Sequence, residues 1–188
     1  MTPEQIALTL QELFGPDVQT IAPGSWQVER PNYRLLVLLS DDLSWLRILI
    51  PIVPAQEAQP FLEQLLEANF DVTQETRYAL MQDVLWGVFQ HNRESLVTSD
   101  FSGAIARLLS LHERGLSDCF NQLVQSRVRQ IIKAAKLQGQ SLEATLQTLD
   151  RFYEEGLMGD MAQGAAAREQ VLAAWRYQLE RFWPEVEP

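Results

Sequence analysis

The fold is decided by residues 33–53, which read YRLLVLLSDDLSWLRILIPIV. The two apolar runs within it, 33–39 and 43–53, are too short and too rich in branched side chains to prefer helix. Asp41 and Asp42 between them form a turn signal. A turn of this length cannot hold a crossover connection, so the runs are predicted to be antiparallel neighbours in one sheet.

Three more strands are expected around this pair. Trp26 and Val28 alternate with polar residues just before the first run, which predicts a strand of the same meander. The runs 77–82 and 84–91 are rich in aromatic and branched side chains and lie on either side of Asp83, so they predict a hairpin. The sequence therefore predicts a five-stranded antiparallel sheet.

Helical patterns surround the strands. Thr2 and Gln5 have the spacing of a capping box at the start of a first helix. A second helical pattern follows Pro54, with Asn69 expected to end it in a left-handed conformation, and a third begins at a capping signal within 98–100. Beyond Gly115 the pattern is helical only, and it predicts three helices at 116–137, 142–155 and 161–182. The fold class expected is α+β, in the order α-β-β-β-α-β-β-α with a C-terminal helical extension.

Both faces of the two central strands are apolar. One face collects Leu35, Val37, Leu39, Leu46, Ile48 and Ile50, and the opposite face collects Leu36, Leu38, Trp45 and Leu49. The three helices of the N-terminal part can cover only one of these faces. Large apolar side chains left in water cost about 1.5 to 3 kcal/mol each, so a second cover is expected. The candidates are the C-terminal helices, the same face of a second subunit, or a client protein.

Composition narrows the class of protein. The 188 residues are enough for one domain, or a small domain with an appendage, and the 25 acidic and 15 basic residues give a net charge of −10. That charge disfavours general binding to nucleic acid or to anionic lipid. The sequence shows no signal peptide and no stretch able to span a bilayer, and its single cysteine agrees with a reducing compartment, so we expect a cytoplasmic protein.

One basic stretch runs against the acidic average. Its four cations are Arg127, Arg129, Lys133 and Lys136. A solvated helix face, or a complement to acidic neighbours, explains such a cluster more often than an anion site does. A site for an anion or a partner is the alternative.

The sequence contains no recognisable catalytic or metal-binding motif. Phosphate-loop, dinucleotide, nucleophile-elbow and calcium-loop signatures do not occur. His112-Glu113 starts like a zincin motif, but Leu116 stands where the second histidine belongs. Cys119 lies among apolar residues and is interpreted as a core residue, and His91 as a surface residue. The acidic pairs Asp41-Asp42 and Glu154-Glu155 are expected to be solvated, which does not favour acid–base catalysis. We therefore expect a protein that is not an enzyme, with no catalytic, cofactor-binding or metal-binding residues and no cofactor.

Partner binding is the function that the apolar second face favours. The residues expected to contact a partner are Trp26, Trp45, Leu49, Arg34, Arg47, Trp175 and Trp183. Arg34 and Arg47 interrupt apolar strands and can share a face, where each can bind a carboxylate from a partner or from Glu29. The alternative is a small-molecule pocket between the sheet and the C-terminal helices, lined by aromatic residues such as Trp45, Trp86 and Trp175.

The order of elements also carries a family resemblance. Two local patterns support it: Leu65-Leu66 with Asn69-Phe70 at the end of the second helix, and Leu96 followed by Phe101, Ile105 and Leu108 in the third. On these features, residues 1–115 resemble class I type III secretion chaperones and YbjN-like proteins. The whole chain resembles cyanobacterial proteins of this fold that have a comparable helical tail.

The resemblance implies a function and a domain organisation. Members of the chaperone family dimerise and hold an extended segment of a partner protein without ATP. The resemblance therefore implies a homodimeric, chaperone-like adaptor that binds proteins and neither nucleic acid nor membranes. We expect an α+β domain at 1–115, and a helical extension at 116–188 that packs on this domain or on a second subunit.

Overall fold

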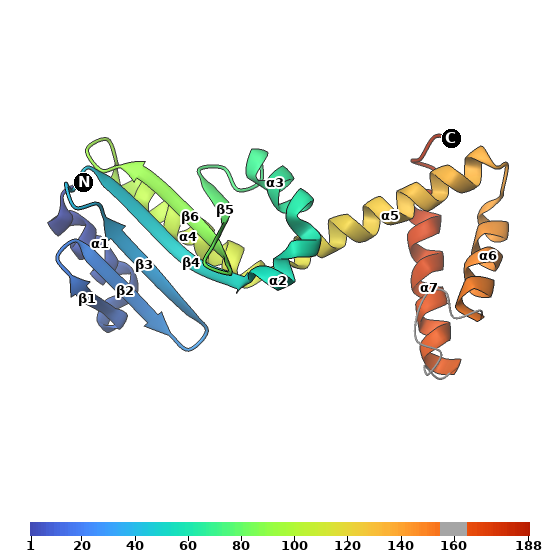
Figure 1. Cartoon of the computed structure of the whole chain (residues 1–188), viewed down its shortest axis with the longest axis horizontal. Coiled ribbons are helices and arrows are strands. Elements are labelled where there is room, and N and C mark those ends of the chain that lie inside the picture. The colour runs from blue at the N-terminus through green and yellow to red at the C-terminus, as the bar shows by residue number, and fades with distance from the viewer. Residues whose placement is uncertain (155–164) are drawn as a thin grey trace. The chain divides into compact units, whose positions relative to one another are not determined.

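The apolar runs of the N-terminal part form one antiparallel sheet (Figure 1). The computed structural model describes residues 1–154 and 165–188. It contains two units, Met1–Phe120 and Asn121–Pro188. The first unit is an α+β structure and the second is helical, so the fold class expected from the sequence is confirmed.

The sheet has six strands in the order β1-β2-β3-β4-β6-β5, and every neighbouring pair is antiparallel. The strands are β1 (Val18–Ala22), β2 (Ser25–Arg30), β3 (Tyr33–Leu39), β4 (Trp45–Pro54), β5 (Thr76–Met81) and β6 (Val84–Asn92). The sequence predicted all of these except β1. This edge strand is almost wholly exposed, so it lacks the alternation of buried and exposed positions that reveals a strand.

Two tight turns set the register of the central and outer strands. Between β3 and β4, the Asp42 carboxylate accepts hydrogen bonds from the Ser40 hydroxyl at 2.6 Å and from the Ser44 backbone N–H at 3.1 Å. Between β5 and β6, Gln82 and Asp83 both have positive φ, at 50° and 60°. Two consecutive residues of this kind are typical of a type I′ hairpin turn, which matches the twist of the strands.

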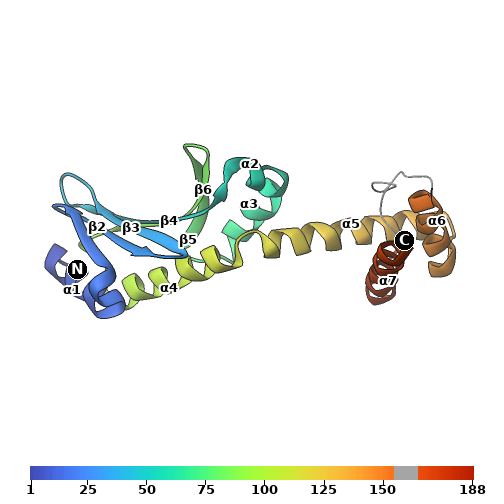
Figure 2. The ribbon, with the colours of Figure 1, turned by 90° about the horizontal axis from the view of Figure 1, so that it is seen from below.

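One face of the sheet is covered by α1 (Pro3–Phe14) and α4 (Thr98–Arg114), which lie on the same side in Figure 2. The core between helices and sheet includes Ile6, Leu10, Trp26, Val37, Ile48, Phe89, Phe101 and Leu108, all at most 5% exposed. The capping box predicted at Thr2 and Gln5 is present at the start of α1. The capping signal expected within 98–100 is not used, because the residue before α4 is Val97 and no side chain caps the helix.

The segment after β4 is broken into three short pieces by Pro60. They are α2 (Ala55–Ala58), a 3-10 turn η2 (Gln59–Phe61) and α3 (Leu62–Phe70). A proline ring cannot donate a helical hydrogen bond, so the break falls at its turn. The left-handed conformation expected at Asn69 is not observed. The helix continues to Phe70, and the Asn69 side chain instead bonds the backbone of Tyr78 in β5.

The second unit is built from α5 (Ser117–Leu137), which begins in the first unit, α6 (Leu142–Glu154) and α7 (Ala165–Phe182). Its own core contains Val128, Ile132, Leu146, Leu149, Leu179 and Phe182. The parts of the predicted helices that fall within 155–164 lie outside the described residues. Within the described residues, no helix is long and apolar enough to cross a membrane.

Candidate functional site

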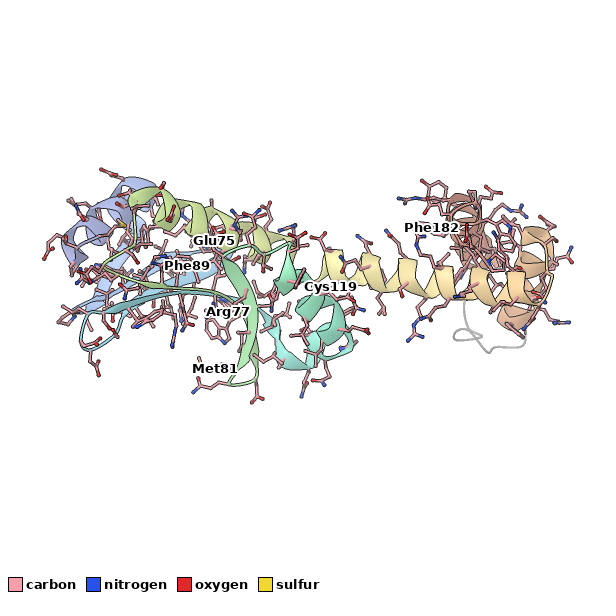
Figure 3. The ribbon with its side chains drawn as sticks, turned by 90° about the horizontal axis from the view of Figure 1, so that it is seen from above. Glu75, Arg77, Met81, Phe89, Cys119 and Phe182 are labelled. Carbon is pink, nitrogen blue, oxygen red and sulfur yellow. The ribbon has the colours of Figure 1, made fainter. Side chains whose placement is uncertain are left out.

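The side chains on the sheet face opposite α1 and α4 form the candidate site. The strand register builds this face in rows that cross the sheet. One row contains Gln27, Leu36, Leu49, Val88 and Arg77, and the next contains Leu38, Arg47 and Gln90. We call this side of the sheet the second face; Trp45 lies on it at the start of β4. Figure 3 shows Arg77 on this side of the sheet and Phe89 on the side of α4.

Large apolar side chains of the second face are exposed at its two ends, Trp45 at the start of β4 and Met81 at the end of β5, and are covered in the middle. Trp45 is 53% exposed, whereas Leu49 and Val88, in the middle of the sheet, are 6% exposed each. Leu36 and Leu38 are half-buried. The expectation that many large apolar side chains would face water therefore holds at Trp45 and does not hold at Leu49.

A groove of about 440 Å³ lies at this end of the second face. It is lined by Leu38, Leu39, Ser40, Trp45, Leu46, Arg47 and Gln90. The sequence predicted Trp45 and Arg47 as contact residues. Leu38 could also have been named, because the short turn after β3 fixes its register opposite Arg47. Gln90 could not have been named from the sequence, because its position beside Arg47 depends on the pairing of β4 with β6.

Arg34 and Arg47, the two arginines of the second face that the sequence predicted as contact residues, differ in their partners. Arg34 binds Glu29 through two hydrogen bonds, from Nε at 2.7 Å and from Nη2 at 2.9 Å. This contact lowers the pKa of the Glu29 carboxyl. Arg47 is exposed and makes no ion pair with any residue of the described ranges. The Glu29 carboxylate, which the sequence offered to either arginine, accepts from Arg34, and Arg47 is left available to a partner.

The remaining tryptophans lie elsewhere. Trp26 alternates with Gln27 along β2, so its side chain points to the face covered by helices, where it is 5% exposed. It is a core residue and does not join Trp45. Trp86 is half-buried on the second face and donates from its indole N–H to the Met81 carbonyl at 3.1 Å. Trp175 and Trp183 belong to the second unit, where both pack against its core.

The titratable groups most suited to catalysis have structural roles. His112 places its Nδ1 atom 2.7 Å from the Pro51 carbonyl oxygen and its Nε2 atom 3.0 Å from that of Asn32. The His91 ring stacks on Phe89. Cys119 is 3% exposed, and burial raises the pKa of its thiol. Among the residues that the structure describes, no group of three His, Cys, Asp or Glu side chains is suited to hold a metal ion.

The acidic pairs named from the sequence have separate outcomes. Asp42 is held by its turn, and three hydrogen bonds from Ser40 and Ser44 lower the pKa of its carboxyl to about 2. A group that ionises so readily is a poor proton donor near neutral pH. Glu155 lies outside the described residues.

Two of the four cations of the basic stretch, Arg129 and Lys136, make contacts within the second unit. Lys136 donates to the carbonyl oxygens of Trp183 at 2.8 Å and Val186 at 2.7 Å. Arg129 lies 4.4 Å over the Phe182 ring and pairs with Glu185 at 2.6 Å. These contacts hold the C-terminal residues against α5, which agrees with the structural interpretation of the cluster.

Comparison with solved structures shows a similarity of fold to type III secretion chaperones, at low sequence identity. A chain of the HopA1–SchA chaperone–effector complex is 14% identical, with a TM-score of 0.47; the match covers 58% of this chain and 88% of that chain. A chain of the Yersinia pestis type III secretion chaperone SycH in complex with a YscM2 fragment is 15% identical, with a TM-score of 0.48 and coverage of 61% and 99%. A chain of the ExsC–ExsE complex is 15% identical, with a TM-score of 0.48 and coverage of 59% and 87%.

The resemblance stated from the sequence named the same class of proteins. No protein-family model and no curated protein matches the sequence.

Proposed function

We propose that this protein is a non-enzymatic, chaperone-like adaptor that holds an apolar segment of a partner protein on the second face of its sheet. The observation that carries the proposal is Trp45, which is 53% exposed beside a groove of about 440 Å³. Exposed tryptophan next to a concave apolar surface is typical of the anchor points of protein interfaces.

The groove favours a segment with a particular chemistry. Leu38 and Trp45 supply apolar contact area, and Arg47 supplies a cation that no described residue neutralises. A guanidinium binds a carboxylate through two parallel hydrogen bonds. The best match is therefore a segment with an apolar side chain for the groove and a nearby Asp or Glu for Arg47.

Site-specific photo-crosslinking in the native cell tests this proposal. Trp45 is replaced by p-benzoyl-phenylalanine, and the control carries the same group in place of Leu8, which is 64% exposed on α1. We expect position 45 to form an adduct with another protein that position 8 does not form. Adding Leu38→Asp or Arg47→Glu to the position-45 variant should remove the adduct, because each change alters the groove and not the crosslinker.

Two outcomes would contradict the proposal. One is the same set of adducts from positions 45 and 8, which would indicate chance encounters. The other is an adduct of the chain with itself only, which would assign the second face to a second subunit. Mass spectrometry of the crosslinked peptide distinguishes these results and identifies the partner segment.

The homodimer expected from the sequence stays a prediction, as do the cytoplasmic location and the packing of the helical extension on the α+β domain or on a second subunit. Light scattering tests the oligomeric state directly. A homodimer has twice the 21.5 kDa mass of the chain. A mass that stays at one chain across the concentration range would exclude it.

A further inference from the structure

A second apolar surface lies on α3, where the helix turns large side chains towards solvent. Phe70 is 94% exposed, Leu66 is 70% exposed, and Val72, just after the helix, is 50% exposed. Leu66 and Phe70 are four residues apart, so they are neighbours on one side of the helix. The other side of α3 is satisfied, because Leu65 is packed with Ala58, Leu85 and Cys119.

The segment that carries these side chains has charges of one sign. Residues 55–75 contain five acidic residues and no lysine or arginine. Glu75 pairs with Arg107 at 3.3 Å, whereas Glu63, Glu67 and Asp71 are exposed and make no ion pair with any residue described by the structure. We call this combined feature the α3 surface; it comprises Glu63, Leu66, Glu67, Phe70, Asp71 and Val72.

The α3 surface is separate from the groove at Trp45. The groove lies where β4 begins, while α2 and α3 follow the opposite end of β4, after Pro54 (Figure 1). A ligand of one surface therefore does not need the other.

The negative charge of the α3 surface determines which kind of molecule can bind there. A second copy of the chain, related by a two-fold axis, would bring the same acidic residues to face one another, and like charges across an interface are strongly unfavourable. Nucleic acid and anionic membranes carry the same negative sign and are excluded on the same ground. Charge complementarity leaves a partner with basic residues around an apolar strip.

We infer that the α3 surface docks a basic amphipathic helix of a partner protein. Leu66 and Phe70 form a ridge of the i, i+4 kind. This ridge packs into a groove between the side chains of the apolar strip of a second helix. Lysine or arginine residues at the border of that strip meet Glu63, Glu67 and Asp71. Because the cationic residues are spaced along a helix, they can contact the acidic residues while the apolar strip covers Phe70.

A model peptide tests this inference without knowledge of the natural partner. The probe is a fluorescent helical peptide of about 18 residues, roughly five turns, with leucine on one face and lysine on the other. Its matched controls are the same peptide with glutamate in place of lysine, and a scrambled lysine–leucine peptide that has no apolar strip. Fluorescence anisotropy with the full-length chain gives the affinities. We expect the basic amphipathic peptide to bind most tightly and to lose affinity as salt is added.

Paired variants locate the binding. Phe70→Ser and Glu67→Lys should each lower the affinity by about tenfold, as the loss of a central contact does. The matched variants Leu8→Ser and Glu12→Lys change an exposed apolar residue and an exposed glutamate on α1, and they should leave the affinity within about twofold. Trp45→Ser should also leave it unchanged, so failure at the α3 surface is distinguishable from failure of the groove at Trp45.

The side chains changed here are exposed, so thermal unfolding by circular dichroism should be the same for all variants, which keeps the comparison valid. Equal binding by the Phe70→Ser variant and the unaltered chain would overturn the inference. So would equal binding of the basic and acidic peptides. Sedimentation showing a dimer that Phe70→Ser abolishes would instead assign the α3 surface to a second copy.

Discussion

Cys119 illustrates how burial suppresses the chemistry of a single residue. Its thiol is 3% exposed among Ala58, Leu65 and Leu85, and burial, with a smaller effect from Asp118, raises its pKa. The thiolate is the reactive form, so we expect iodoacetamide at pH 8 to modify the folded chain about a hundredfold more slowly than the chain unfolded in guanidinium.

Mass spectrometry over a time course measures this rate. The control is Ser117→Cys in a Cys119→Ala background, which places a thiol at an exposed position two residues away. That thiol should react at similar rates in both states. Rapid modification of Cys119 in the folded chain would show that the segment around the start of α5 opens readily.

The ionisation of Asp42, in the turn between β3 and β4, makes the stability of the fold depend on pH. Hydrogen bonds from Ser40 and Ser44 lower the pKa of its carboxyl from 3.8 to about 2. A lowered pKa in the folded state stabilises the fold at pH values above the unfolded value, and this contribution is lost as the pH falls from about 4 to about 2. Carbon-detected NMR should therefore show Asp42 titrating near pH 2, and Asp42→Ala should flatten the fall of unfolding free energy in that range. Titration of Asp42 near 3.8 in the folded chain would contradict this reading of the turn.

At the residue scale, the sequence predicted which residues contact other groups better than it predicted the face of the sheet on which each side chain lies. Trp45 was named as a contact residue, and it is exposed on the second face. Trp26 was grouped with it, although its alternation with Gln27 already assigned it to the covered face. The role of Asn69 could not be predicted, because its partner Tyr78 is reached only when α3 packs beside β5.

At the scale of elements, the hairpin between β5 and β6 is built with unfavourable residues. Gln82 and Asp83 have φ values of 50° and 60°, a conformation that costs an ordinary side chain about 1 kcal/mol or more. Asn-Gly is the preferred pair for this turn. We therefore expect Gln82→Asn with Asp83→Gly to raise the free energy of unfolding by about 1 kcal/mol, measured by urea denaturation.

The glycine control for the hairpin is Gln19→Gly in β1, at an exposed strand position with no positive φ. Glycine there should lower stability, since it adds freedom to the unfolded chain without relieving strain. A loss of stability in the hairpin variant would mean that the native side chains of Gln82 and Asp83 contribute more than their backbone costs.

The elements that the sequence predicted well are those with local signals. The capping box of α1 and the apolar runs of β3 and β4 are examples. β1 has no such signal, because only Val18 is even partly buried and the strand exists by pairing with β2. Leu66 is exposed on the α3 surface although it is the neighbour of the buried Leu65. Which side of α3 is buried depends on how the helix packs beside β5, and helical periodicity alone does not encode this.

At the scale of the whole molecule, the chain has separate apolar cores. The cores of the first unit include Ile48 and Phe89, and that of the second includes Leu179 and Phe182. Phe182 is 2% exposed and lies under Arg129. We expect Phe182→Ala to destabilise the second unit by about 3 to 5 kcal/mol, while the amide protons of β4 keep their protection.

Hydrogen exchange followed by mass spectrometry measures both effects in one sample. The matched variant is Ile48→Ala, which should lower protection in the sheet and leave α6 and α7 unchanged. If Phe182→Ala released the amides of β4 as well, the two units would unfold as one cooperative structure.

The contact between Asn69 and Tyr78 has a consequence for the behaviour of the protein at high concentration. The Asn69 amide accepts from the Tyr78 N–H at 2.7 Å and donates to the Tyr78 carbonyl at 3.1 Å, so it occupies the bonding positions that a neighbouring strand would take. Open strand edges are templates for chain-to-chain polymerisation. At Tyr78 a single carboxamide terminates the ladder, and it thereby protects this edge of the sheet against pairing with a strand of another chain.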